Sequence, residues 1–294
     1  VFHWLSKITI IDFLSVLRYT QERINYTSIG YLRHRGGVTM TTWNIKNMNI
    51  GEGIPKIIVP LVGETEEEIL EEAAFVRELA PDVVEWRADL YEHVENLDKV
   101  KALLTKLRTI FEKELLLFTF RSHKEGGKKE ISDVFYAKLN ETAIQTKQID
   151  LIDVELFSKK ESIEQLIATA NDNAVYVIMS NHDFEKTPSK EEILARLCQM
   201  RDYGAHILKL AVMPRNAGDV LTLLDATYTM KTEYADRPLI TMSMAGTGVI
   251  SRLAGEVFGS DFTFAAGKDA SAPGQIPVEE LRSVQGTIHK NLTY

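Results

Sequence analysis

The sequence predicts an α/β fold, a (β/α)8 TIM barrel, and two observations support this prediction. Eight short runs rich in apolar and β-branched residues recur along the chain, and a longer segment of mixed polarity follows each run. The runs are apolar almost throughout, which is typical of parallel strands that are covered on both faces. Eight such units in roughly 230 residues fit a closed barrel better than an open sheet. The predicted strands are 57–62, 83–88, 115–121, 151–156, 175–181, 207–212, 239–244 and 262–267.

Two of the segments between the strands show the pattern of helices with defined starts. Residues 65–80 and 189–204 carry acidic residues in their first turns, where the helix dipole favours negative charge. Each segment begins at a hydroxyl residue that is followed three positions later by a glutamate, which is the arrangement of a capping box. The predicted boxes pair Thr65 with Glu68 and Ser189 with Glu192.

The start of the chain differs from the rest. Residues 1–39 are basic and lack the alternation of strand and helix, so we interpret them as an extension upstream of the natural start or as a disordered tail. Met40 is then the expected first residue of the natural protein, and residues 40–294 form one catalytic domain. At the start of that domain, residues 43–56 predict a β-hairpin whose turn contains glycine. N-terminal sequencing of the natural protein tests the predicted start.

The composition favours a globular protein that acts on small molecules. The net charge of −8 over 294 residues works against binding to nucleic acid or to anionic membranes. No apolar run approaches the roughly 20 residues of a membrane-spanning helix, so the cytoplasm is the expected location. The single cysteine, Cys198, cannot form an internal disulfide, and the sequence shows none of the cysteine and histidine spacings of a zinc site.

Lys209 is the most informative polar residue, because it interrupts the apolar strand 207–212. Strand alternation places Lys209 on the same face as Ile207 and Ala211. Burial disfavours a charged lysine, which leaves an amine that can attack a carbonyl group. Two structural alternatives remain open from the residues alone: a lysine at an edge that reaches solvent, or an ion pair with Glu85.

His182 and three arginines also fall near the carboxyl ends of predicted strands, where catalytic residues of such barrels gather. His182 suits proton transfer near neutral pH, although a single histidine is more often structural. Arg87, Arg121 and Arg252 can bind a carboxylate through their planar guanidinium groups, or can simply pair with acids at the rim of the barrel.

Six segments together resemble one known family, the type I 3-dehydroquinate dehydratases of the shikimate pathway. They appear in the order and with the spacing of that family, and the resemblance spans Met40 to the C-terminus. The segments are EWRAD (85–89), FTFRSHKEGG (118–127), MSNHDF (179–184), ILKLAVMP (207–214), MSMAGTGVISRLAGEVFGS (242–260) and ASAPGQI (270–276). Residues 1–39 have no counterpart, and Pro60 stands where the family has a small polar residue.

This resemblance implies a hydro-lyase that removes water from 3-dehydroquinate to give 3-dehydroshikimate, the third step of the shikimate pathway of aromatic amino-acid biosynthesis. Lys209 matches the lysine that forms an imine, or Schiff base, with the substrate. His182 matches the general acid and base, and Glu125 matches a glutamate that orients it. The substrate-binding positions implied are Glu85, Arg87, Arg121, Arg252, Ser271 and Gln275. The resemblance further implies that the protein is a homodimer and that the hairpin closes the barrel bottom. The lysine serves as the electron sink, so no metal or organic cofactor is expected. Enclosing the substrate requires loop closure, and residues 268–276, which contain alanine, serine, glycine and proline, are the candidate lid.

Two other functions are weighed against this one. A class I aldolase would share the imine-forming lysine but would cleave a carbon–carbon bond. A catalytically silent barrel would bind a small acid without turning it over.

Overall fold

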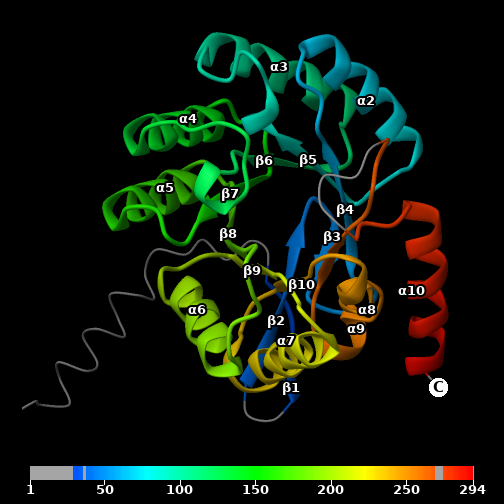
Figure 1. Cartoon of the computed structure of the whole chain (residues 1–294). Coiled ribbons are helices and arrows are strands. Elements are labelled where there is room, and N and C mark those ends of the chain that lie inside the picture. The colour runs from blue at the N-terminus through cyan, green and yellow to red at the C-terminus, as the bar shows by residue number, and fades with distance from the viewer. Residues whose placement is uncertain (1–28, 36–37, 269–273, 294) are drawn as a thin grey trace, which may run out of the picture.

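The computed structural model describes residues 29–35, 38–268 and 274–293, and its main body is a barrel of parallel strands surrounded by helices (Figure 1). All eight predicted strands are present, with boundaries that differ from the predicted ones by a few residues at most. In chain order the strands are β4 (Lys56–Leu61), β5 (Val83–Arg87), β6 (Leu115–Thr119), β7 (Leu151–Glu155), β8 (Tyr176–Asp183), β9 (Ile207–Val212), β10 (Leu239–Ser243) and β11 (Phe262–Phe264). Their hydrogen-bonded order is β10-β9-β8-β7-β6-β5-β4-β11, with parallel neighbours throughout, so the predicted (β/α)8 TIM barrel is confirmed.

The helices follow the strands and cover the outside of the barrel (Figure 1). They are α2 (Glu66–Glu78), α3 (Leu97–Ile110), α4 (Asp133–Gln145), α5 (Lys160–Asp172), α6 (Lys190–Asp202), α7 (Ala217–Thr229), α8 (Val249–Leu253), α9 (Gly255–Phe258) and α10 (Val278–Leu292). The capping box at the start of α2 is confirmed, because Thr65 and Glu68 each accept the other's backbone N–H. The second box is wrong in one half. Ser189 accepts from the Glu192 N–H, but the Glu192 carboxylate pairs with Arg196 instead.

Strand alternation divides the core into an outer and an inner layer. In β4, Ile57 and Val59 pack outward against the helices, whereas Ile58 points into the barrel. The same alternation in β9 sends Leu208 and Leu210 outward. Polar side chains on the inner face of a strand are therefore held at fixed points inside the barrel. In the described part of the chain, no helix is long and apolar enough to cross a membrane.

The barrel is closed between β10 and β11 by a small cluster of polar groups. The backbone N–H of Asp261 donates to the Leu239 carbonyl at 2.7 Å, and the Asp261 carboxylate accepts the Leu239 N–H at 2.7 Å. Ser260 Oγ accepts the Thr241 N–H at 3.1 Å. Lys231 Nζ donates to both carboxylate oxygens of Asp261, each at 2.7 Å. Two adjacent side chains thus supply much of the bonding that a strand ladder supplies elsewhere in the barrel.

A hairpin of β2 (Val38–Ile45) and β3 (Met48–Ile50) lies at the amino-terminal ends of the barrel strands, as the resemblance implied. Its turn is Lys46-Asn47, with φ of 48° and 66°, so the predicted glycine-containing turn is wrong. The Gly51 and Gly53 positions come after the second strand. β1 (Ile29–Arg35), which the sequence did not predict, pairs antiparallel with β2 and makes a three-stranded sheet.

The hairpin is anchored to the barrel by aromatic and charged contacts. The Trp43 ring meets the rings of Tyr176 and His206 edge to face, with centroids 5.8 and 5.4 Å away. His206 Nδ1 also accepts the backbone N–H of Val177 at 2.9 Å. Lys46 reaches Asp150, just before β7, at 2.9 Å. These contacts cover the end of the barrel opposite to the functional site.

Candidate active site

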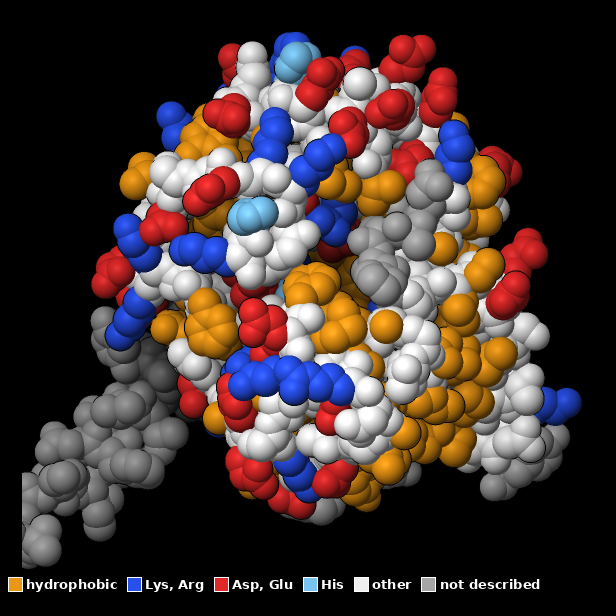
Figure 2. Space-filling view, viewed as in Figure 1, with side chains coloured by type: hydrophobic (Ala, Val, Ile, Leu, Met, Phe, Trp, Pro, Cys, Tyr) orange, Lys and Arg blue, Asp and Glu red, His pale blue; other side chains and the backbone are white. Residues whose placement is uncertain are grey.

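A cavity of about 280 Å³ opens at the carboxyl ends of the strands. Figure 2 shows it as a hollow near the middle of the face turned to the viewer. Eight of the nine predicted site residues line this cavity, and the ninth, Ser271, lies outside the described residues. The eight are Glu85, Arg87, Arg121, Glu125, His182, Lys209, Arg252 and Gln275. Segments from most of the chain therefore converge on one site.

Lys209 projects from β9 into the barrel on the same face as Ile207 and Ala211, as strand alternation predicted. Its side chain is 3% exposed, so it does not reach bulk solvent along an edge. Its Nζ donates to Asp153 Oδ2 at 3.0 Å and lies 3.7 Å from Glu85 Oε1. The ion pair with Glu85 that was left open from the sequence is present, but the closer carboxylate is that of Asp153, which the sequence reasoning missed.

Arg121 joins the acids inside the barrel. Its Nη1 donates to Glu155 at 2.8 Å and to Ser180 Oγ at 3.0 Å, and its Nη2 donates to Asp153 Oδ2 at 2.9 Å. Burial works against the charge of Arg121, but Asp153, Glu155 and Glu125 together raise its pKa well above its usual range. The guanidinium is thus charged, and much of its hydrogen-bonding capacity is used by protein carboxylates.

His182 and Glu125 form a buried acid–base pair. His182 Nδ1 lies 2.9 Å from Glu125 Oε2, and the His182 backbone N–H donates to the same oxygen at 3.0 Å. Burial, followed by the positive charges of Arg121, Lys209 and Arg87, lowers the pKa of His182 well below its usual range. The imidazole is therefore neutral at neutral pH and can accept a proton from a substrate.

Burial also acts on Glu125. It raises the pKa of the Glu125 carboxyl to about 8, with a contribution from the carboxylates of Glu155 and Asp153 and against the opposing charge of Arg121. A carboxyl group ordinarily has a lower pKa than an imidazolium. In this pair the pKa of Glu125 is raised and that of His182 is lowered, so the order is reversed. Glu125 can therefore hold a proton at neutral pH and exchange it with Nδ1 of the imidazole.

A chain of hydrogen bonds connects Glu125 through Asn181 to Arg196, which lies outside the cavity. Asn181 Nδ2 donates to Glu125 Oε1 at 3.1 Å, and its Oδ1 accepts from Arg196 Nη1 at 2.8 Å. Arg196, on α6, also pairs with Asp183 at 3.6 Å. Because one end of the Asn181 amide is an acceptor for arginine, its other end must present N–H to Glu125. The orientation of the glutamate thus depends on a residue outside the cavity.

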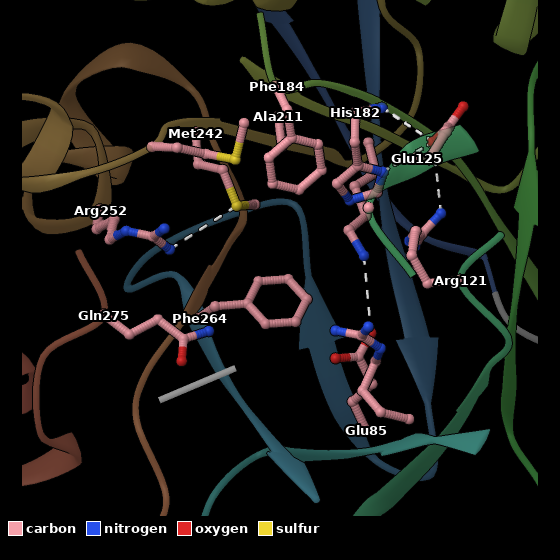
Figure 3. Close-up of a pocket in the computed structure, with 14 residues that line it drawn as sticks. Glu85, Arg121, Glu125, His182, Phe184, Ala211, Met242, Arg252, Phe264 and Gln275 are labelled. Carbon is pink, nitrogen blue, oxygen red and sulfur yellow. Dashed lines mark hydrogen bonds and ion pairs between the residues drawn. The ribbon is translucent and has the colours of Figure 1, made fainter. Parts of the chain in front are cut away.

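Arg252 and Gln275 lie on one side of the cavity, and His182 and Glu125 lie on the other (Figure 3). Arg252 is 1% exposed, and its Nη1 is 3.8 Å from the sulfur of Met242. Burial lowers the pKa of Arg252 to about 10, which still leaves it charged at neutral pH. Arg87 is held by both oxygens of Asp89 at 2.8 and 2.9 Å. A small anion in the cavity thus meets a buried positive charge opposite the acid–base pair.

Two aromatic residues complete the cavity and were also missed by the sequence reasoning. Phe264 presents its ring to Lys209, with Nζ 4.7 Å from the ring centroid. The Phe184 ring lies nearly parallel to the His182 imidazole, 6.4 Å away between centroids, and packs over Gly126. A β-carbon at Gly126 would come within 2.5 Å of the Phe184 ring, so this position requires glycine.

Comparison with known proteins identifies the family. A family model described as Type I 3-dehydroquinase matches residues 57–292. The chain belongs to this family. It is 62% identical to the 3-dehydroquinate dehydratase of Bacillus velezensis over 253 residues, which cover 86% of this chain and 100% of the relative. It is likewise 62% identical to the 3-dehydroquinate dehydratase of Bacillus subtilis over 252 residues, which cover 86% of this chain and 99% of the relative.

Solved structures agree with this assignment. A type I 3-dehydroquinate dehydratase from Clostridium difficile, determined with covalently modified comenic acid, superposes with a TM-score of 0.84 at 52% identity. The match covers 86% of this chain and 99% of that one. Membership in the type I 3-dehydroquinase family confirms the predicted family and the predicted reaction, dehydration of 3-dehydroquinate by a hydro-lyase of the shikimate pathway.

Proposed function

We propose that the chain dehydrates 3-dehydroquinate through an imine on Lys209, with His182 as the general acid and base. The observation that carries this proposal is a buried lysine that shares a cavity with a histidine whose Nδ1 lies 2.9 Å from the Glu125 carboxyl. An amine in such a place can form a covalent bond with a ketone, and a neutral imidazole can move the protons that the bond changes require.

Imine formation comes first. The Lys209 amine attacks the C3 carbonyl carbon, and His182 carries one proton from the nitrogen to the carbonyl oxygen, which gives a neutral carbinolamine. The hydroxyl then leaves as water, again with a proton from His182, and a protonated imine remains. Glu125 supports both transfers, because it can return a proton to Nδ1 of the imidazole at 2.9 Å. The positive nitrogen now withdraws electrons from the neighbouring carbon.

Elimination follows. His182 removes the acidified C2 proton, and the electrons move into the imine as an enamine. The enamine expels the C1 hydroxyl, which leaves with the proton that His182 returns, and the protonated imine is restored. Water hydrolyses the imine and releases 3-dehydroshikimate with the free amine. The nitrogen of Lys209 serves as the electron sink, so these steps use only groups of the protein.

The carboxylate of the substrate is proposed to bind at Arg252, with Gln275 beside it. This places the anion on the side of the cavity opposite His182, which leaves the ring of the substrate between the two groups (Figure 3). Arg87, Arg121 and Glu85 complete the proposed substrate contacts from the strand ends. Ser271 is proposed as a further contact on the strength of the resemblance alone.

Borohydride trapping tests the proposal. The protein is incubated with 3-dehydroquinate and reduced with sodium borohydride, and peptide mass spectrometry locates the adduct. An adduct on Lys209, together with an absorbance increase from the dehydrated product, is expected. Lys209→Ala should abolish turnover, and His182→Ala should slow it severely while still allowing slow trapping. An adduct on another lysine, or turnover by Lys209→Ala, would exclude the mechanism.

The same experiment separates the two rival functions. An aldolase that used Lys209 would also be trapped but would release two fragments, whereas dehydration conserves the carbon skeleton. A silent barrel would bind the substrate without any absorbance change. The family membership and the acid–base pair at His182 both favour dehydration.

We also propose that the protein is a cytoplasmic homodimer. An exposed apolar area lies over α7, α8, α9 and α10, at the lower right of the molecule in Figure 2. Its large exposed residues are Leu221, Tyr228, Ile250, Val257, Val284 and Leu292. Apolar patches of this kind are typical of protein interfaces. Light scattering coupled to gel filtration measures the mass in solution, and cell fractionation tests the location.

A further inference from the structure

Asp153 contacts the Lys209 nitrogen but is not among the residues that line the cavity. Its Oδ2 is 3.0 Å from Nζ, and its side chain is fully buried. Glu85, the other carboxylate near Nζ, is 3.7 Å away and lines the cavity itself. A substrate that enters the cavity can therefore contact Glu85 and Lys209, which line it, whereas Asp153 contacts the lysine without lining the cavity.

The position of Asp153 does not depend on Lys209. Its Oδ1 accepts from Ser180 Oγ at 2.5 Å, and its Oδ2 accepts from Arg121 Nη2 at 2.9 Å as well as from the lysine. Burial alone would raise its pKa, but the charges of Arg121 and Lys209 hold the pKa of Asp153 at about 2. The carboxylate thus stays ionised and in place when the lysine nitrogen changes its bonding.

We propose that Asp153 is a catalytic residue, the fixed counter-ion of the Lys209 nitrogen both as the free ammonium and as the protonated imine. This inference rests on the imine mechanism proposed above. The amine R–NH2, the ketone and one proton give R–NH⁺=C and water, so the iminium keeps one N–H and one positive charge. Asp153 accepts that N–H and balances that charge at the same place where it now holds the lysine.

Two consequences for the reaction follow from this geometry. First, once the nitrogen has given up one proton, an N–H donated to Asp153 at 3.0 Å holds the amine in place while its lone pair attacks the carbonyl carbon. Second, the iminium keeps its proton, which it needs in order to withdraw electrons during the elimination. A charge that is already in position needs no reorganisation as the reaction proceeds, and this is the condition under which electrostatic stabilisation is largest.

Asp153→Asn tests the proposal, with Glu155→Gln as the matched control. Both acids lie on β7 and bind Arg121, at 2.9 and 2.8 Å, but of the two only Asp153 contacts Lys209. Both variants remove one negative charge and keep the shape of the side chain. In Asp153→Asn we expect kcat to fall about 100-fold. The pH dependence of kcat should also change in this variant. The fall of kcat at high pH, its alkaline limb, should move to lower pH by about one unit or more, because the iminium loses its proton more easily.

Glu155→Gln should keep the alkaline limb of the wild-type protein, whatever its effect on kcat. Ser180→Ala provides a second, milder variant, since it removes the 2.5 Å bond to Asp153 without changing any charge. It should shift the alkaline limb in the same direction by a smaller amount. Circular dichroism and thermal unfolding of each variant establish that the fold is retained, and Ser180→Ala carries the test if Asp153→Asn does not fold.

The outcomes separate this inference from the proposed function. If borohydride traps no adduct on Lys209 of the wild-type protein, the imine mechanism itself fails. If the wild-type adduct forms but Asp153→Asn, or Ser180→Ala in its place, leaves the alkaline limb unmoved, only the counter-ion role is overturned. An equal shift in Glu155→Gln would also overturn it, because the effect would then belong to the general field of the acids and not to contact with the nitrogen.

Discussion

The His206 side chain at the barrel bottom should make the stability of the protein depend on pH. Burial, with a smaller contribution from the charge of Arg237, lowers the pKa of His206 from 6.5 to about 4. The lone pair at Nδ1 is also occupied, because it accepts the Val177 N–H at 2.9 Å. The folded protein therefore keeps this imidazole neutral at pH values where the unfolded chain takes up a proton.

The sign and size of the effect follow from this difference. Between pH 6.5 and 4 only the unfolded state gains the proton, so the free energy of unfolding falls as the pH falls. One unit of pKa corresponds to about 1.4 kcal/mol, so moving from pH 7.5 to pH 5 should cost about 2 kcal/mol through His206 alone. His206→Asn removes this contribution, because asparagine can place a carbonyl oxygen near the position of Nδ1 and does not titrate.

Urea unfolding of both proteins at pH 7.5 and pH 5 measures the effect. The loss of stability on acidification should be about 2 kcal/mol smaller in His206→Asn than in the wild type, because other titrating groups contribute equally to both. Equal losses in the two proteins, to within about 0.5 kcal/mol, would refute the reasoning. In that case the imidazole would be protonated, or accessible to water, in the folded state.

Three further predictions concern the cavity. Glu125→Gln should lower kcat about 10- to 100-fold with little change in KM, because His182 loses its proton partner and part of its orientation; steady-state kinetics that show an unchanged kcat would contradict this role. Arg196→Met should lower kcat several-fold at constant KM, since the Asn181 amide is then free to turn its oxygen toward the glutamate, and full activity would show that the surface arginine has no part in positioning. Arg252→Gln should raise KM about 10- to 100-fold, the loss expected for a charged hydrogen bond to a carboxylate, and a variant with wild-type KM would move the carboxylate site elsewhere.

The strands could be predicted from the sequence because each is a continuous apolar run between polar segments. The buried, parallel character of the sheet makes this signal strong, and it does not depend on any single residue. Boundaries of local features were harder to predict. The Lys46-Asn47 turn adopts positive φ without glycine, so the nearby glycines drew the predicted turn to the wrong place. The carboxylate of Glu192 had a nearby arginine as an alternative partner, and pattern alone does not decide between the two.

Asp153 and Glu155 were missed although a signal was present. They occupy alternate positions of β7, so both point into the barrel together with Arg121 and Lys209. Asp153 lies within β7 and Glu155 is its last residue, so both interrupt an apolar strand in the way that Lys209 interrupts β9. Two acids spaced by two residues within an apolar strand are costly to bury unless partners are present, and that cost is the clue. Which partners they find depends on the closure of the barrel, which no local pattern contains.

The junction between β10 and β11 has a consequence for how the barrel opens. The other neighbouring barrel strands are joined by backbone ladders of two to six residue pairs. Here, instead, Asp261 links Leu239 and Lys231 by its backbone and both carboxylate oxygens. The junction between β10 and β11 therefore depends largely on the side chain of Asp261. Backbone amides next to Asp261 should exchange with deuterium sooner than those between β8 and β9. Local opening of the barrel should therefore begin between β10 and β11.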